Sequence, residues 1–303
     1  MNPITIALRN KGPSDFLRRS ARIAGRYGWT SRKMDDALAE YVTVLDRHDC
    51  RATFPITSVA LQRNPHTIRQ YVARGIEFAV HGYRHIDYTQ LSVSDQRSQL
   101  QRASQAFSKV GIQPDGHRSP YLRWDENTLA SLQHQGFLYD SSQALVWDVA
   151  DEQETPAYQH VLSFYKAKSA TDYPSLPRLE DHFVHIPYSL PDDEAMLERL
   201  ALRTREQISE LWAAILQRTH QLGELFVLGL HPERSATCQE ALSVVLAEAR
   251  SYTPDVWIAR LDEIAVWWRD RAQTAVKISE CGGGCIELAV TGPSGTTVFA
   301  RSC

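Results

Sequence analysis

Short apolar, β-branched runs alternate along this chain with longer segments of helical apolar spacing, and this alternation constrains the fold most strongly. Strands are predicted at Ile4–Leu8, Ala52–Thr57, Ile76–Val80, Gly116–Arg118, Tyr139–Ser141, Phe183–Leu190, Leu225–Leu230 and Val256–Ala259. Helices are predicted at Met34–Arg47, Val59–Arg74, Ser94–Val110, Glu126–Gln135, Glu194–Leu222 and Cys238–Arg250. Strands that alternate with helices form parallel sheets, so the chain is expected to fold as an α/β protein with a closed or nearly closed barrel.

The pattern changes near Thr274, where short strand-like runs are separated by Gly-Gly-Gly and Gly-Pro-Ser-Gly. We therefore expect a barrel over residues 1–273 and a small antiparallel β meander over residues 274–303. Cys281-Gly-Gly-Gly-Cys285 is read first as a turn, with metal binding or a disulfide as the alternative. The open edge of the meander could pair with a second copy and form a homo-oligomer.

The charge pattern excludes some partners. A formal net charge of −3 gives no reason to expect nucleic acid. No stretch reaches the roughly 20 apolar residues of a membrane span, and none resembles the apolar core of a signal peptide, so a cytoplasmic location is expected.

Residues 151–179 lack a clear period and are predicted to be a long surface loop beside the substrate groove.

The segment His81-Gly-Tyr-Arg-His85 directly follows the predicted strand Ile76–Val80. Parallel-sheet enzymes keep their chemistry at this end of the strands. Two neutral imidazoles four residues apart could bind one divalent metal, if a neighbouring strand supplies a third ligand. Such a pair is also an ordinary feature of exposed helices, so the surrounding motifs decide between the two interpretations.

Three further motifs follow: Arg118-Ser-Pro-Tyr121, Tyr139-Asp140-Ser-Ser142 and Leu228-Gly-Leu-His231-Pro232. With the His81–His85 segment, they resemble in order and approximate spacing the motifs of the polysaccharide deacetylase family of carbohydrate esterases. The resemblance covers about residues 1–273. It implies a distorted (β/α)7-type barrel, a metal held by His81 and His85, and an Asp140 that steadies Arg118.

Hydrolysis of an acetamide requires a polarised carbonyl, an activated water and a proton for the leaving amine. A metal on His81 and His85 would supply the first two, and His231 at a strand end could donate the proton. Arg118 keeps its charge and would hold a carboxylate or a sugar oxygen, unless it merely pairs with Asp115 or Asp125. Tyr121 could offer its backbone N–H to the oxyanion and its ring to a sugar.

Aromatic residues give further candidates for sugar stacking. Trp124 and Trp147 could stack on a sugar, although Trp124 could equally belong to the core. Trp257, Trp267 and Trp268 are predicted to pack in the core and at the barrel seam.

The first family motif is degenerate in this chain. The family's first strand ends in Thr-Phe-Asp-Asp-Gly, where one Asp is the base and the next binds the metal. Here Arg9 and Asn10 occupy these positions, so the base is lost and the metal ligand becomes a neutral amide. Asp87, two residues beyond His85, could replace the base, with helix capping as an equally good alternative. Arg9 could instead bind an anionic group on the substrate.

The sequence therefore predicts a hydrolase of carbon–nitrogen bonds other than peptide bonds, which removes the N-acetyl group of a sugar or glycan. The predicted cofactor is a divalent metal, zinc, with His81, His85 and Asn10 as ligands. Two alternatives stay open: a relative that binds glycan without turnover, and a metal-independent amidohydrolase of small cyclic amides.

Overall fold

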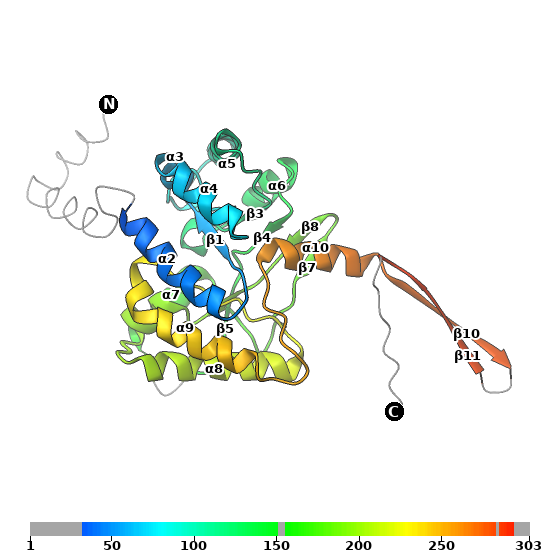
Figure 1. Cartoon of the computed structure of the whole chain (residues 1–303). Coiled ribbons are helices and arrows are strands. Elements are labelled where there is room, and N and C mark those ends of the chain that lie inside the picture. Colours follow the sequence, from blue (N-terminus) through cyan, green and yellow to red (C-terminus); the bar gives the residue numbers. More distant parts are fainter. Residues whose placement is uncertain (1–31, 151–154, 283–284, 294–303) are drawn as a thin grey trace, which may run out of the picture.

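The computed structural model describes residues 32–150, 155–282 and 285–293 (Figure 1). A six-stranded sheet has the order β1-β2-β3-β4-β8-β7, with all neighbours parallel except the antiparallel β7 and β8. Its strands are β1 (Thr53–Ile56), β2 (Glu77–Val80), β3 (Gly116–His117), β4 (Tyr139–Asp140), β7 (Arg178–Glu180) and β8 (Phe183–His185). The predicted strand Ile4–Leu8 lies outside the described residues.

The five parallel strands end in one row. Ile56 pairs with Val80, Val80 with His117, His117 with Asp140, and Asp140 with His185. The next residue of each strand therefore lies at the same edge of the sheet. This edge carries His81 and Arg118, whose backbone N–H groups donate to the carbonyls of Ile56 and Val80, each at 2.9 Å.

A second sheet has the order β6-β5-β9, with β5 (Ala144–Val146), β6 (Lys168–Ser169) and β9 (Tyr188–Leu190). β4 and β8 each continue, after a short break, into β5 and β9. The single predicted strand Phe183–Leu190 is thus two strands in two sheets.

Two predicted strands, Leu225–Leu230 and Val256–Ala259, are extended but unpaired as regular strands among the described residues. The first bonds to β9 where the Ser189 N–H donates to the Val227 carbonyl, at 3.3 Å. Its Leu225 N–H instead donates to the Ser175 carbonyl of a loop, at 2.8 Å. Residues 225–230 therefore do not form a regular ladder of hydrogen bonds with β9.

The helices pack around these sheets (Figure 1). They are α2 (Arg32–Arg47), α3 (Ser58–Arg63), α4 (Pro65–Ala73), α5 (Val93–Val110), α6 (Glu126–His134), α7 (Pro156–Tyr165), α8 (Arg205–Leu222), α9 (Ser235–Ala249) and α10 (Leu261–Ala272). The short helical turns are η1 (Tyr88–Gln90), η2 (Pro120–Leu122), η4 (Ala195–Arg199) and η5 (Pro232–Arg234). α5 buries its apolar stripe against the first sheet, whereas α8 and α9 pack against each other around a second core cluster that contains Trp212.

Two predicted helices are interrupted. Val59–Arg74 is split into α3 and α4, because Pro65 starts a new helix at its first position. Glu194–Leu222 begins with a π-helical turn, breaks at Ala201, which has a φ of 58°, and restarts after the Thr204 cap.

The predicted long loop over residues 151–179 is wrong in its described part. It contains α7 and β6, and β7 begins at Arg178. The Thr155 hydroxyl accepts a hydrogen bond from the Tyr158 N–H at 3.1 Å, and Pro156 follows at the first helical position. α7 then buries Tyr158 and Val161, so a cap followed by proline was the missed signal.

The N-terminus of α6 has a complete capping box. The Asp125 carboxylate accepts from the Thr128 N–H at 2.9 Å, and the Thr128 hydroxyl accepts from the Asp125 N–H at 3.2 Å. We expect Asp125→Ala to lower the free energy of unfolding by about 1 kcal/mol, because the first turn loses this cap. Urea denaturation measures it, and Glu126→Ala at the next exposed position is the control. An equal change in both variants would contradict the prediction.

The C-terminal part begins with α10 and continues into the antiparallel hairpin of β10 (Ala275–Gly282) and β11 (Cys285–Thr291), which projects from the body (Figure 1). This pair matches the first part of the predicted meander, and residues 294–303 lie outside the described residues. Trp257 and Trp267 are 57% and 49% exposed, so their predicted core position is wrong, whereas Trp268 packs partly against the core. None of the described helices is both long and apolar enough to cross a membrane.

Candidate active site

His81 is positioned by the end of β2. Its Nδ1 lies 2.8 Å from the carbonyl oxygen of Arg118, so Nδ1 carries the proton and donates it. Burial lowers the pKa of His81 well below its ordinary value, and the neighbouring His85 lowers it further. The imidazole is therefore neutral near pH 7, with Nε2 as its electron-pair donor.

His85 and Tyr121 lie against each other beside His81. The rings of His81 and His85 have centroids 5.0 Å apart, and those of His85 and Tyr121 are 4.4 Å apart. Tyr121 is 44% exposed and its φ is 59°, in the left-handed region that a non-glycine residue rarely adopts. Leu122 follows with a φ of 52°, and such backbone strain often marks functional sites.

Arg118 connects the two halves of this site. Its guanidinium donates from Nε to the Ser141 carbonyl at 2.9 Å and from Nη2 to the Ser141 hydroxyl at 2.8 Å. The same group lies over the ring of Tyr188, 4.5 Å from its centroid. Burial lowers the pKa of Arg118, and it is opposed by the Tyr188, Tyr139, Asp140 and Asp192 side chains.

Among the described residues, Ser141, and not Asp140, accepts the hydrogen bonds of the Arg118 guanidinium. The Asp140 carboxylate pairs with Nδ1 of His117 at 2.8 Å and accepts from the Ser142 hydroxyl at 2.7 Å and the Ser142 N–H at 3.0 Å. Asp140 thus acts on Arg118 through its charge and by fixing the turn that carries Ser141. The Ser142 hydroxyl in turn accepts from the Ser119 N–H at 2.8 Å.

His231 forms an ion pair with Asp193. Its Nδ1 lies 2.6 Å from Asp193 Oδ1, and its backbone N–H donates to Asp193 Oδ2 at 2.7 Å. Burial lowers the pKa of His231, but the hydrogen bond and the charge of Asp193 outweigh it and raise the pKa to about 9. The side chain is 41% exposed, so a protonated imidazolium near pH 7 remains accessible.

Tyr188 joins Arg118 to this ion pair. Its hydroxyl donates to Asp192 Oδ2 at 2.7 Å, and Asp192 precedes Asp193. Gly229 allows the contact, because a Cβ there would lie 1.8 Å from the Tyr188 hydroxyl. Through its carbonyl, Arg118 contacts His81, and through its guanidinium it contacts Tyr188. His81 and the His231 pair thus lie at the same end of the strands.

Asp192 and Asp193 were missed as site residues by sequence reasoning. Both directly follow the predicted strand Phe183–Leu190 and Pro191, which is the same signal that singled out His81. They also directly precede the predicted helix Glu194–Leu222, and Asp192 Oδ1 accepts from the Ala195 N–H at 2.9 Å, as a residue at a helix start does.

Asp87 caps a helical turn, which was the alternative to its predicted catalytic role. Its Oδ1 accepts from the Thr89 N–H at 2.9 Å and from the Thr89 hydroxyl at 2.7 Å. Its Oδ2 pairs with Nε of Arg123 at 3.3 Å. Both carboxylate oxygens are therefore occupied, and these contacts argue against Asp87 as the base.

Of the two tryptophans predicted to stack on sugar, Trp147 is buried and Trp124 is partly buried. Trp124 packs partly buried against the core, and Trp147 is buried in the second core cluster. Phe164 has its ring centroid 6.4 Å from that of Tyr121. Arg9 and Asn10 lie outside the described residues, so their predicted roles stay predictions.

Two of the predicted metal ligands fit a metal. A metal-binding histidine commonly donates its second ring N–H to a backbone carbonyl, as His81 does to Arg118. The neighbouring His85 ring lies close enough to share a ligand with it. A second group, Asp192, Asp193 and His231, brings potential ligand atoms within 4.8 Å of one another. Its carboxylates already accept from Tyr188, Ala195 and His231, so this group fits an ion pair better than a metal site.

Comparison with known proteins supports the same family. Residues 28–139 match the model of the polysaccharide deacetylase family. The chain is 37% identical over 106 residues to a peptidoglycan deacetylase-like protein of Gibberella zeae, which covers 35% of this chain and 28% of that protein. The chain thus spans little more than a quarter of the length of this curated relative.

The fold is shared with solved structures. A protein of Mycobacterium smegmatis assigned as a polysaccharide deacetylase has a TM-score of 0.60 and 25% identity, with 78% of each chain covered. One from Pseudomonas aeruginosa PAO1 has a TM-score of 0.62 and 24% identity, with 77% of this chain and 72% of that chain covered. An allantoinase has a TM-score of 0.62 and 22% identity at the same coverage. The last two similarities show the fold alone.

The predicted α/β barrel class with a C-terminal antiparallel strand pair is therefore confirmed. The family match includes the His81–His85 segment and Arg118, and it ends before Asp193 and His231. The resemblance predicted from the motifs is borne out: residues 28–139 match the polysaccharide deacetylase family, and the fold is that of solved structures assigned to it.

Proposed function

We propose that this protein is a hydrolase that removes the acetyl group from the nitrogen of an N-acetylated sugar or glycan, with a divalent metal, zinc, as cofactor. One observation carries the proposal. Arg118 contacts His81 through its carbonyl and Tyr188 through its guanidinium, and Tyr188 bonds Asp192, the neighbour of the Asp193 that pairs with His231; this chain of contacts supports one shared site. The neutral imidazole of His81 and the protonated ring of His231 are the two kinds of group that amide hydrolysis needs.

His231 would be the general acid. Because Asp193 raises its pKa to about 9, the imidazolium holds a proton near pH 7 that it can give to the leaving amine. Asp193 also bonds the His231 backbone, which fixes the ring's direction. Asp193 is thus a positioning residue that acts through His231.

His81 and His85 would hold the divalent metal. When bound, such an ion polarises a carbonyl and lowers the pKa of water. Arg118 contributes by keeping Nδ1 of His81 bonded and Nε2 available. No carboxylate among the described residues has been placed as the third ligand, and Asn10 stays the prediction for that position.

The exposed rings of Tyr121 and Phe164 would bind the sugar. Tyr121 lies beside His85 and Phe164 lies beside Tyr121, and these two rings are 44% and 39% exposed. An aromatic ring stacks well on the apolar face of a pyranose, and the strained backbone of Tyr121 fixes its ring at this position.

Acetate release from N-acetylated oligosaccharides, with and without chelator, tests the proposal. We expect release that stops with chelator and returns with zinc. Binding without release would favour a glycan-binding relative, and turnover of cyclic amides that survives chelation would favour a metal-independent amidohydrolase. Either result would contradict the proposed deacetylase.

We expect His81→Ala to weaken zinc binding at least about tenfold. The substitution removes one ligand, the imidazole that the Arg118 carbonyl holds in place. Competition with a zinc indicator measures this affinity. His134→Ala, at an exposed position on α6, is the matched control and should bind as the native protein. Equal affinity in both variants would remove the proposed metal site.

A further inference from the structure

A cavity of about 430 Å³ lies at the other edge of the first sheet. It is lined by Asp115, which precedes β3, and Leu138, which precedes β4, together with one face of α10. The catalytic candidates follow these strands, so the cavity opens near the opposite ends of the strands. It is a shallow depression that is open to solvent, so a ligand would lie across it and would not be enclosed.

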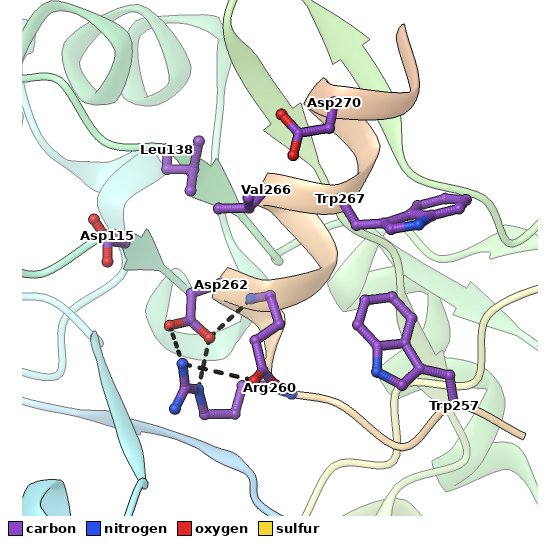
Figure 2. Close-up of a pocket in the computed structure, with 9 residues that line it drawn as sticks. Asp115, Leu138, Trp257, Arg260, Asp262, Val266, Trp267 and Asp270 are labelled. Carbon is purple, nitrogen blue, oxygen red and sulfur yellow. Dashed lines mark hydrogen bonds and ion pairs between the residues drawn. The ribbon is translucent and has the colours of Figure 1, made fainter. Parts of the chain in front are cut away.

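Two exposed indoles form part of its lining. The ring centroids of Trp257 and Trp267 are 6.1 Å apart and the ring planes meet at 58°. They are 57% and 49% exposed, although large aromatic rings are normally buried. Figure 2 shows them side by side on one flank of α10, with Asp115 and Leu138 on the other flank. An open angle between two indoles suits a flat ligand with apolar faces.

This aromatic cluster already accommodates a cation. The guanidinium of Arg271 lies 4.7 Å from the ring centroid of Trp268 and 6.0 Å from that of Trp267. Indole faces attract positive charge through their quadrupole. Trp257 offers a second face of the same kind.

The rest of the lining carries an excess of negative charge. Four carboxylates, those of Asp115, Asp262, Glu263 and Asp270, face one guanidinium, that of Arg260. Arg260 is committed to Asp262, with contacts from Nε and Nη2 of 2.9 Å each. The carboxylates of Asp115 and Asp270 accept no hydrogen bond from any group in the described ranges.

The positions of Asp115 and Asp270 determine where a further cation could lie. Burial and the charge of Asp262 raise the pKa of Asp115 and outweigh the opposing effect of Arg260, so one guanidinium does not balance the carboxylates there. Asp270 lies one helical turn beyond Trp267 on α10. Figure 2 shows its carboxylate above Trp267 and directed away from the indole, toward the side of Leu138 and Asp115.

We infer that this cavity binds a cationic amino sugar, with the sugar faces against Trp257 and Trp267 and the ammonium group beside Asp270 and Asp115. A ligand for this cavity needs apolar faces for the indoles and a positive charge for the carboxylates. An amino sugar has both, whereas a neutral N-acetylated sugar lacks the charge. Its biological source rests on the proposed function, because deacetylation turns a neutral acetamide into an ammonium group. The cavity would then hold the deacetylated part of a glycan while the opposite edge acts on the rest.

Calorimetric titration of the full chain with a fully deacetylated glucosamine tetrasaccharide tests this site. Trp257→Ala should weaken binding about tenfold, because one stacking surface is lost. Asp270→Asn should weaken it severalfold, and the effect should shrink at high salt. Tyr173→Ala and Asp172→Asn, exposed residues away from the cavity, are matched controls and should bind as the native protein.

Two further ligands separate the recognition elements. The N-acetylated tetrasaccharide should be insensitive to Asp270→Asn, and spermine, which has amines but no sugar faces, should be insensitive to Trp257→Ala. Unchanged binding of the deacetylated tetrasaccharide to both cavity variants would overturn the inference. The inference would also be overturned if the cavity variants bound less only because they no longer formed a dimer, which sedimentation of each variant would measure.

The same titration distinguishes this site from the proposed activity. His231→Ala should abolish acetate release and leave the effect of Trp257→Ala on binding unchanged. Binding that depends on Trp257 in a protein without deacetylase activity would sink the proposed function and keep the cavity. Acetate release without Trp257-dependent binding would keep the proposed function and rule out the cavity as a ligand site.

Discussion

Replacing Asp193 by Asn should lower kcat for acetate release by about 10²–10⁴-fold, the usual contribution of a positioned general acid. The native carboxylate holds Nδ1 of His231 at 2.6 Å and the backbone N–H at 2.7 Å. An amide offers one acceptor oxygen and no charge, so the imidazolium loses its counterion. Asp172→Asn, on an exposed loop, is the control for the loss of one surface charge.

The pH profile distinguishes this role from a structural one. In the native protein the pKa of His231 is raised to about 9, so activity that needs the protonated ring should fall as the pH rises through about 9. Without Asp193, burial is opposed by the charge of Asp192 alone, so the alkaline limb should move to clearly lower pH. An alkaline limb that stays in place would show that His231 is not the acid.

The same ion pair affects stability with a definite sign. A histidine whose pKa is raised by folding stabilises the native state fully below the unfolded value, and this stabilisation is lost as the pH rises through the folded value. For His231 the window runs from the ordinary 6.5 to about 9. Because the ring is 41% exposed, solvent screening keeps this contribution small.

Gly229→Ala should lower the free energy of unfolding by about 3 kcal/mol, equivalent to more than a hundredfold in the folding equilibrium. The new Cβ would lie 1.8 Å from the Tyr188 hydroxyl and 2.3 Å from Cζ, so the buried ring must move. The move would break the hydrogen bond to Asp192 and the stacking of Arg118. Urea denaturation measures the stability change, and acetate release measures the disturbance of the site.

A double-mutant cycle controls this prediction. Tyr188→Phe removes the atom that lies nearest to the new Cβ, so it should restore about 1 kcal/mol in the Gly229→Ala background. In the native background the same change should destabilise, because Asp192 loses the hydroxyl that donates to it. Additive effects of the two substitutions would mean that Gly229 and Tyr188 do not meet.

The sequence predicted the first two strands of the sheet because their apolar runs are continuous. Ala52–Thr57 and Ile76–Val80 contain β1 and β2, and the strand-end rule placed His81 at the correct edge. The pattern is strongest for β2, which lies inside the parallel sheet and is mostly buried, whereas β1 is a half-buried edge strand.

The rest depended on contacts that no local pattern reports. Whether Trp257 and Trp267 are core or surface depends on which segment covers α10, and none of the described segments buries them. The sequence did not show that Asp192 and Asp193 belong to the site, because acidic residues at this position are equally expected at the start of a helical turn. The ion pair with His231 joins residues 38 positions apart and becomes visible with the folded chain.

A crystal structure of the Asp193→Asn variant with zinc and an N-acetylated oligosaccharide tests the central claim most directly. We predict zinc at the His81 and His85 imidazoles and one acetamide between that ion and the His231 ring. Zinc at another position, or a sugar whose acetamide reaches only one of these two histidine groups, would contradict the shared site.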